Sequence, residues 1–345
     1  MQQLMLHGPG TVTWTEVSDP VMSDGEAAIV RPIAVATCDL DVAVLRGRLP
    51  LEGPYPFGHE AVAEVVEVGD LVRSVSVGDL VVVPFQISCG ACGPCRRGRT
   101  GNCAAHPPLS AYGLGTIGGV RWGGLLADRA LVPHADAMLV RVPEGITPAA
   151  AASVSDNIAD AWRTVGPPLQ AEPDAEMLVV GGDGGANSIG LYAAGLACAL
   201  GAARVVYADQ SPERLALAAG LGAETIEGPW PRKLGSFQVT VDASGSEDGL
   251  RCALNSTGFD GTCTCVAVYL TDATLPLLAM YSRCCTLHIG RAHARPAIDE
   301  VLALMTDGFD PCPVTSAVAE WGDAVAALSD PPMKLVITRD STPDR

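Results

Sequence analysis

The sequence is poor in basic residues. Its 345 residues include 22 Lys and Arg against 39 Asp and Glu, which gives a formal net charge of −17 at pH 7. Nucleic acids and anionic membranes attract basic surfaces, so neither is expected as a partner. We interpret the acidity as an aid to solubility.

The chain also lacks a segment suited to a membrane or to secretion. The longest apolar run, from Ile189 to Ala203, is interrupted by glycine and is shorter than the roughly 20 residues of a spanning helix. The opening residues, Met1-Gln2-Gln3, have no basic region of a signal peptide. With twelve cysteines and no secretory signal, we expect a reducing cytoplasm and metal sites rather than disulfides. Seven cysteines have no metal-ligand spacing and are expected to be small buried side chains: Cys198, Cys252, Cys263, Cys265, Cys284, Cys285 and Cys312.

The length and the pattern of the chain predict two domains of different type. Residues 1–150 contain short alternating segments between Gly- and Pro-containing turns, which is typical of a barrel-like β domain. The strands expected there are 3–6, 11–17, 26–36, 61–68, 80–83, 125–132 and 138–141. From about residue 174, strands alternate with helices, which predicts a parallel sheet with crossover helices. The strands expected in that part are 177–180, 204–208, 237–241, 263–269 and 286–289.

Four cysteines follow a C-x2-C-x2-C-x7-C spacing: Cys89, Cys92, Cys95 and Cys103. Gly and Pro between them allow tight turns, so several sulfurs can point at one centre. Four thiolates around one point fit a closed, tetrahedral, structural zinc site. An iron–sulfur cluster is the alternative, but its bacterial spacing ends in C-x3-C-P, and here Ala104 follows the last cysteine.

A glycine-rich turn lies between the strand that ends at Val180 and the next expected helix. Gly182 and Gly184 supply the first two glycines of a dinucleotide fingerprint, and Gly185 or Gly190 must take the close-packing role. Backbone N–H groups and the helix dipole favour a pyrophosphate at such a turn.

Asp209 ends the following strand, at the distance from the turn expected of a carboxylate that binds ribose hydroxyls. Because it would repel a 2′-phosphate, NAD is favoured over NADP. Neither Arg204 nor Arg214 takes an obvious 2′-phosphate position. The alternative is that Asp209 is only a turn residue.

Cys38 and His59 are candidates for a second zinc site, since a thiolate and an imidazole both suit zinc. The sequence resembles the zinc-containing medium-chain alcohol dehydrogenase superfamily in the order and spacing of four features. These are Cys38, the Gly58-His59-Glu60 segment, the four-cysteine motif and the glycine-rich turn. The resemblance covers nearly the whole chain. It implies an α/β fold with a GroES-like β-barrel catalytic domain at 1–154, carrying the zinc lobe at about 86–106. It further implies a Rossmann NAD-binding domain at 155–291, a return to the catalytic domain at 292–345, and a catalytic zinc in the cleft between the domains.

The resemblance also implies site residues. Asp156, counted back from Trp162, stands where the family often has a cysteine as its third zinc ligand. Cys38, His59 and Asp156 would leave one open position for substrate or water. Asp156 as a helix N-cap, with Asp160 as the rival ligand, is the alternative.

The resemblance also implies roles for Glu60 and Lys334. Glu60 would support the metal from nearby or replace a ligand during exchange; otherwise it is a barrel-edge acid paired with an arginine. Lys334, just before the last expected strand, would contact the pyrophosphate of the dinucleotide.

The chain departs from the family at its proton relay. Leu40 stands where the family has Ser or Thr, and Ala43 stands where some members have His. Leucine can neither donate nor accept a proton, so Asp39, Glu60, Asp156 or bulk water would have to serve.

The expected function is a cytoplasmic, zinc-dependent, NAD-linked alcohol dehydrogenase that acts on a secondary or polyol-like alcohol. The expected complement is two zinc ions per chain, and the expected assembly is a homodimer or homotetramer. Because the proton relay is missing, the alternative function is that of a reductase of conjugated carbonyl compounds. A third reading is a non-catalytic NAD-binding protein, but the intact Cys, His and Asp set argues against it.

Overall fold

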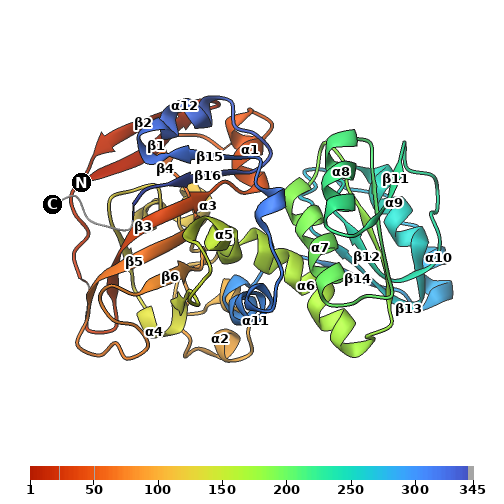
Figure 1. Ribbon diagram of the computed structural model, residues 1–345, viewed down its shortest axis with the longest axis horizontal. Helices are drawn as coiled ribbons and strands as arrows, with labels where there is room; N and C mark the ends of the chain where they lie inside the picture. The colour runs from red at the N-terminus through yellow and green to blue at the C-terminus, as the bar shows by residue number, and fades with distance from the viewer. Residues whose placement is uncertain (23, 50, 341–345) are drawn as a thin grey trace. The chain divides into compact units, whose positions relative to one another are not determined.

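The computed structural model describes residues 1–22, 24–49 and 51–340, and the chain forms two compact units (Figure 1). The β-rich unit contains Met1–Ala159, Ala292–Thr306 and Thr315–Arg345. The Rossmann-type unit contains Asp160–Arg291 and Asp307–Val314. The chain thus leaves the β-rich unit and returns to it twice.

The β-rich unit is built around β3 (Ala28–Ala36). This strand pairs antiparallel with β5 (Glu60–Val68) and with β16 (Leu335–Thr338), so residues from both ends of the chain become neighbours. The sheet order is β15-β16-β3-β5-β6-β8, with β7 also on β3. The other strands of this sheet are β6 (Leu80–Val83), β7 (Ala130–Val132), β8 (Val140–Arg141) and β15 (Ala317–Glu320).

A second sheet of the β-rich unit has the order β2-β1-β4. Its strands are β1 (Gln2–Gly8), β2 (Thr11–Glu16) and β4 (Tyr55–Pro56). Leu4, Leu6, Phe57 and Leu125 belong to one buried core with the inner faces of both sheets. Burying each such side chain stabilises the fold by about 1.5–3 kcal/mol.

Short helices join these strands. They are α1 (Asp39–Leu45), α2 (Gly93–Arg96), α3 (Gly115–Gly118), α4 (Ala135–Met138), α5 (Pro148–Ala151), α11 (Ala294–Thr306) and α12 (Ala324–Ser329). The 3-10 turn η3 (Ala152–Ser155) leads into α6 (Asn157–Ala171). The boundary between the two units falls within α6, after Ala159.

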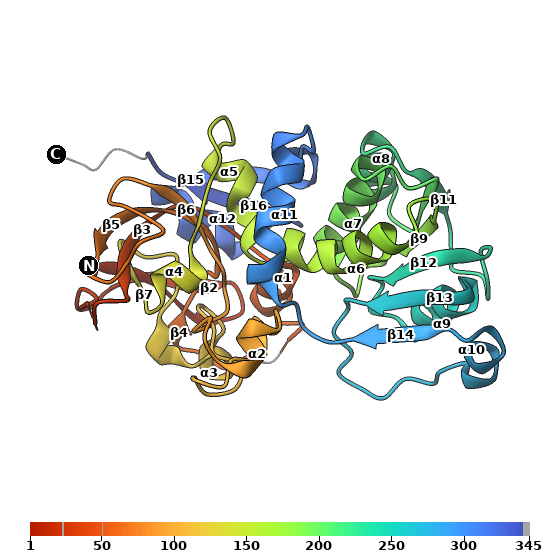
Figure 2. The same ribbon diagram turned by 90° about the horizontal axis from the view of Figure 1, so that it is seen from below.

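The Rossmann-type unit is a six-stranded, fully parallel sheet with helices against it (Figure 2). Its strands, in sheet order, are β11 (Glu224–Glu227), β10 (Arg204–Asp209), β9 (Glu176–Val180), β12 (Phe237–Asp242), β13 (Thr257–Cys265) and β14 (Thr286–Ile289). The helices include α7 (Asn187–Ala199), α8 (Pro212–Gly220), α9 (Glu247–Ser256) and α10 (Leu277–Arg283).

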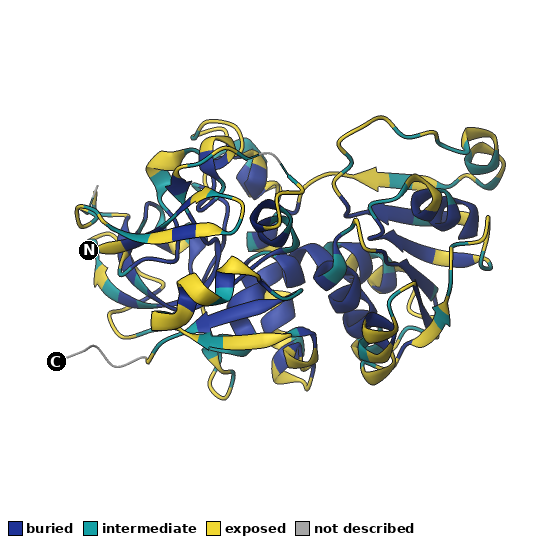
Figure 3. Ribbon diagram, turned by 90° about the horizontal axis from the view of Figure 1, so that it is seen from above, coloured by how far each residue is buried: buried dark blue, intermediate teal, exposed yellow. Residues whose placement is uncertain are grey.

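The chain reverses direction across this sheet at β9, because β10 lies on one side of it and β12 on the other. Such a switch point, at the carboxyl ends of the strands, is where open α/β sheets bind their ligands. The central strands are buried on both faces (Figure 3). A β-rich unit of largely antiparallel sheets combined with a fully parallel, Rossmann-type sheet confirms the α/β fold class expected from the sequence.

Three strands differ from their expected bounds by more than two residues at an end. The strand expected at 125–132 is reduced to β7, because Leu125 and Leu126 donate to Gly58 and Phe57 outside a regular ladder. The segment expected at 138–141 splits into α4 and β8. The strand expected at 263–269 begins earlier, at Thr257, and ends at Cys265, where its pairing with Ile289 of β14 also ends. Among the described residues, no helix has the length and apolarity needed to cross a membrane.

Candidate functional site

Cys38 lies two residues after the end of β3 and caps α1. The backbone N–H of Asp41 donates to Cys38 Sγ at 3.3 Å, and the N–H of Cys38 donates to Asp41 Oδ2 at 3.1 Å. This reciprocal cap fixes both side chains at the end of the central strand. The Cys38 side chain is buried.

His59 lies just before β5, whose first residue, Glu60, pairs with Ala36 at the end of β3. Gly58 has a φ of +88°, which favours glycine, and a Cβ on it would lie 3.0 Å from the Leu126 backbone nitrogen. This glycine lets the chain turn so that His59 reaches the Cys38 end of the sheet.

Asp156 ends η3, which is held against β5. Ser155 Oγ accepts a hydrogen bond from the N–H of Ala61 and donates one to Ala152 O, both at 2.9 Å. Asp156 Oδ2 then lies 3.3 Å from His59 Nε2. The rival ligand Asp160 pairs with Arg163 instead and is not part of this group.

One cluster therefore contains Cys38, His59, Glu60 and Asp156, with a ligand atom from each within 4.8 Å of the others. The first three side chains are buried, and that of Asp156 is 13% exposed. Burial raises the pKa of Cys38 to about 12, and the neighbouring Asp41 adds to the effect. Without a cation, the thiol would thus keep its proton.

Glu60 continues the cluster into the protein interior. Lys334 Nζ donates to Glu60 Oε2 at 2.7 Å and to Asn157 Oδ1 at 2.9 Å. Neither Glu60 nor Lys334 has exposed surface. Burial raises the pKa of Glu60 to about 7, although Lys334 acts in the opposite direction.

The expected contact of Lys334 with a dinucleotide pyrophosphate stays a prediction. In the structure its ammonium group is fully buried and binds Glu60 and Asn157. The pairing of β16 with β3, Val336 opposite Ala36, carries the lysine to this interior position.

The donor set fits a zinc ion. It offers a thiol, an imidazole and carboxylates, the ligand types of open catalytic zinc sites. Among the described residues, Glu60 Oε1 is a buried oxygen without a hydrogen-bond partner, which is costly unless a cation approaches it. Asp41 Oδ1 lies 3.5 Å from His59 Nδ1, where a carboxylate can orient a metal-binding imidazole.

The four cysteines form a separate group in the β-rich unit. Sulfurs of Cys89, Cys92, Cys95 and Cys103 all lie within 4.8 Å of one another. Cys92 Sγ and Cys103 Sγ are 3.9 Å apart, close to the roughly 3.8 Å that tetrahedral zinc with about 2.3 Å bonds requires. Backbone N–H groups of Cys95 and Ala104 lower the pKa of Cys92 to about 6, which favours the thiolate. This group fits a closed zinc site.

The glycine-rich turn joins β9 to the N-terminus of α7. A Cβ on Gly185 would overlap the carbonyl oxygen of Ala243, whereas a Cβ on Gly184 would find its nearest atom at 3.4 Å. Gly190, the other candidate for the close-packing role, also packs tightly, because a Cβ on it would lie 2.9 Å from the Cβ of Ala243. A Cβ on Gly182 would lie 2.6 Å from the Trp230 ring, so the turn also requires a residue without a side chain at position 182. The turn fits a pyrophosphate at the helix N-terminus.

Asp209 does not have the arrangement expected from the sequence. Its carboxylate is fully buried and accepts five hydrogen bonds, while an ionised carboxylate offers about four lone-pair sites. The donors are Tyr207 Oη, the backbone N–H groups of Gln210 and Ser211, and Nε and Nη2 of Arg214. All lone-pair sites of this carboxylate are therefore engaged within the protein, and its expected contact with ribose hydroxyls stays a prediction.

Arg214 was not expected in a 2′-phosphate position, and in the structure it binds two carboxylates. Its Nη2 donates to Asp209 Oδ1 at 2.6 Å and to Asp183 Oδ1 at 2.7 Å. Burial would raise the pKa of Asp209, but the hydrogen bonds from Arg214 and from Ser211 outweigh burial and lower it.

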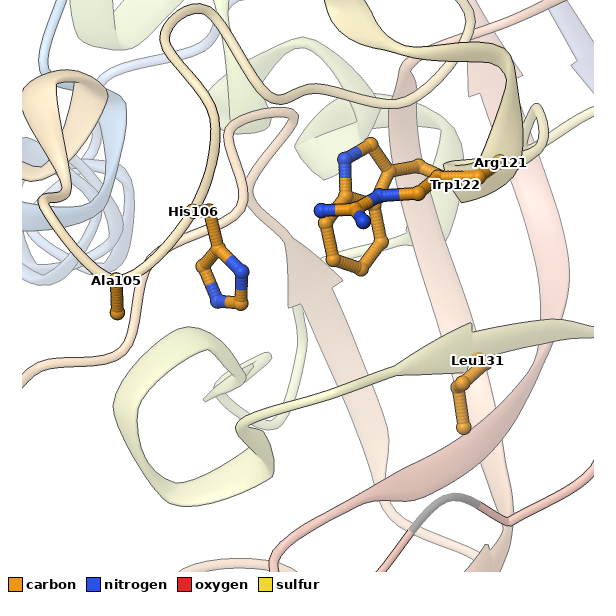
Figure 4. Close-up of a pocket in the computed structure, with 5 residues that line it drawn as sticks. All are labelled: Ala105, His106, Arg121, Trp122 and Leu131. Atoms are coloured by element: carbon orange, nitrogen blue, oxygen red, sulfur yellow. The ribbon is translucent and has the colours of Figure 1, made fainter.

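A surface pocket of about 430 Å³ lies elsewhere in the β-rich unit (Figure 4). It is lined by Ala105, His106, Arg121, Trp122 and Leu131. Leu131 pairs with Ile29 near the start of β3, seven residues from Ala36, which corresponds to about 23 Å at roughly 3.3 Å per residue. The pocket is therefore remote from the Cys38 cluster.

Sequence reasoning missed Asp41, Asn157, Asp183 and the true position of Lys334. Only Asp41 left a local signal, since an acid three residues after a capping residue can close a reciprocal cap. The partners of the other three depend on pairings between distant parts of the chain.

Two family models match the sequence. The model of the alcohol dehydrogenase GroES-like domain matches residues 24–144, and that of zinc-binding dehydrogenases matches residues 188–306. The first match contains Cys38, His59, Glu60 and the four cysteines, whereas Asp156, Lys334 and the glycine-rich turn lie outside both matches.

Curated proteins and solved structures give further matches. A Mycobacterium tuberculosis protein named a probable zinc-binding alcohol dehydrogenase is 31% identical over 322 residues, covering 89% of this chain and 79% of that protein. The glutathione-independent formaldehyde dehydrogenase of Pseudomonas aeruginosa is 32% identical over 267 residues, 73% of this chain but only 64% of its own length. The structure of an alcohol dehydrogenase from Thermus sp. ATN1 matches with a TM-score of 0.88 and 27% identity, covering 98% of this chain and 99% of that one.

Proposed function

The chain belongs to the zinc-binding alcohol dehydrogenase family and is an oxidoreductase, and on that premise we propose that it interconverts a secondary or polyol-like alcohol and its carbonyl compound. Its cofactors are zinc and NAD. The observation that carries the proposal is the buried cluster of Cys38, His59, Glu60 and Asp156, whose ligand atoms lie within 4.8 Å of one another.

In this proposal Cys38, His59 and Asp156 hold the catalytic zinc, and the four cysteines hold the structural one. A zinc ion with an open position acts as a Lewis acid on an alcohol or carbonyl oxygen. Asp41 Oδ1, 3.5 Å from His59 Nδ1, places a negative charge beside the ring. Lys334 holds Glu60 behind the ligands, so that one carboxylate oxygen stays directed at the cluster.

The apolar side chain of Leu40 has a consequence for the proton. Leu40 is the second residue of α1, directly after the Cys38 cap, and it has no group that accepts a proton. The alcohol proton then leaves through a carboxylate of the cluster or through water, and oxidation should be favoured at higher pH. The substitution Leu40→Ser, which supplies a hydroxyl at this point, should raise the rate of alcohol oxidation near neutral pH.

The other readings have less support. The relatives named above are dehydrogenases of alcohols or of formaldehyde, so a reductase of conjugated carbonyls is not favoured. A non-catalytic NAD-binding protein would have no need for a complete open-site donor set.

The assembly we propose is a homo-oligomer. Strand β14 is an edge strand, and large apolar side chains on and near it are exposed. Ile289 is 69% exposed, Leu278 80% and Tyr281 84%, and exposed apolar surface of this kind marks interaction sites. The compartment we propose is a reducing cytoplasm, since none of the twelve cysteines forms a disulfide.

The experiment that tests the function combines metal analysis with substrate profiling. The purified protein should contain about two zinc ions per chain and oxidise some members of a panel of secondary alcohols, polyols and formaldehyde with NAD. Turnover of enals or enones alone would support the conjugate reductase instead. A protein that holds zinc but binds no NADH would refute the dehydrogenase proposal.

A further inference from the structure

At the carboxyl ends of β9 and β10, three charged side chains form one chain of contacts. Arg214 Nη2 lies between Asp183 Oδ1 and Asp209 Oδ1, at 2.7 Å and 2.6 Å. Arg214 Nε adds a second contact to Asp209, at 2.8 Å. All three residues belong to the Rossmann-type unit.

The two carboxylates differ in exposure. The Asp209 side chain has no exposed surface and that of Arg214 is 11% exposed, whereas that of Asp183 is 80% exposed. Asp209 and Arg214 thus form a buried pair of zero net charge. The group as a whole carries one net negative charge, and its exposed part is Asp183.

Asp183 also has the right location to meet a dinucleotide. It stands between Gly182 and Gly184 in the turn that leads into α7, and Arg214 ties it to the end of β10. The turn is where the pyrophosphate is expected, and the end of the second strand is where the adenosine ribose is expected. A 2′-phosphate would add about two negative charges at this place.

We infer that Asp183, not Asp209, is the residue that makes this protein select NAD over NADP. The inference rests on the proposed function. Asp209 is neutralised and enclosed, so its role is to hold Arg214 and the start of α8. The exposed carboxylate of Asp183 supplies the negative charge that a 2′-phosphate meets, and it also keeps Arg214 from turning toward that phosphate.

The test measures binding, not turnover. NADH and NADPH are titrated into the full-length, zinc-loaded protein, and their dissociation constants are obtained from nucleotide fluorescence. For Asp183→Asn we expect NADPH to bind about tenfold more tightly, with NADH changed less than twofold. The preference of the unchanged protein for NADH should weaken as salt rises, because the repulsion involves an exposed charge, and this salt dependence should be lost in the variant.

The matched control is Asp174→Asn, which removes an exposed carboxylate just before the opposite end of β9. It should leave both dissociation constants unchanged. An Asp183→Asn protein with an unchanged NADPH constant would overturn the inference while leaving the proposed function intact. If the unchanged protein binds neither nucleotide, both fail. Thermal unfolding curves check that the variants remain folded.

Discussion

Lys334 Nζ lies 2.7 Å from Glu60 Oε2, and neither side chain has exposed surface. Lys334 is one of only two lysines in the chain. The pair joins the last strand, β16, to the first residue of β5, and Asn157 completes the contacts of the ammonium group. Removing one partner of an ion pair buried this deeply strongly destabilises the folded protein, because the other charge is left unpaired.

Replacing Lys334 by methionine should therefore destabilise the β-rich unit by about 3–5 kcal/mol, because Glu60 is left as an unpaired buried acid. The double variant Lys334→Met, Glu60→Gln should recover a large part of this loss. Urea unfolding of the single and double variants measures both values. The other lysine, Lys233, is exposed, and Lys233→Met is the matched control. Additive losses in the double variant would show that the two groups are not coupled.

Metal analysis should separate the two zinc sites. Cys38→Ser removes a ligand of the mixed cluster, so zinc should fall from about two to about one per chain, with dehydrogenase activity lost. Cys92→Ser should remove the other ion and lower the thermal stability, because binding at a closed site contributes to folding. Cys312, an exposed thiol outside both groups, provides the control Cys312→Ser. An unchanged zinc content in either ligand variant would contradict the assignment of that site.

The sequence predicts these metal groups well because ligand chemistry leaves local marks. The four cysteines lie within 15 residues of sequence, from Cys89 to Cys103, and His59 is flanked by a recognisable glycine and acid. Asp156 needed the family resemblance, since an acid before a helix is otherwise a common cap.

The remaining features depend on long-range packing. Lys334 reaches Glu60 because Val336 pairs with Ala36, and no local pattern in the sequence reveals that register. Arg214 reaches Asp209 because α8 folds back over the end of β10. Pro167 and Pro168 lie inside α6, where packing overrides the low helix propensity of proline.

The histidine pair at the surface pocket should make the stability of the protein mildly pH-dependent. His106 and His134 face each other with their Nε2 atoms 2.9 Å apart, a contact that requires at least one neutral ring. Burial lowers the pKa of His106, and the charges of His134 and Arg121 lower it further. In the unfolded chain its pKa is about 6.5.

Since the folded state binds the proton less readily, this contribution to stability is present above about pH 6.5 and is lost as the pH falls through the lowered pKa. The melting temperature should thus drop less between pH 7.5 and pH 5 in His106→Asn than in the unchanged protein. The control is His288→Asn, at an exposed residue of β14. Equal drops in all three proteins would refute the role of His106.

The tightest backbone contact of the dinucleotide turn gives the last prediction. Gly185 packs on the carbonyl of Ala243, which follows β12, and an added Cβ would overlap that oxygen. Gly184, one residue earlier, has its nearest atom at 3.4 Å, an ordinary contact. Gly185→Ala must then push the turn away from β12, and we expect a loss of about 1–3 kcal/mol in stability together with loss of NADH binding.

Gly184→Ala should leave the melting temperature within about 2 °C, corresponding to less than about 1 kcal/mol. It should still weaken NADH binding, because a methyl group then stands where the backbone approaches the pyrophosphate. Melting curves and NADH titrations of the two variants separate packing from ligand contact; a Gly185→Ala protein with unchanged stability would mean that Ala243 and the turn do not meet as the structure shows.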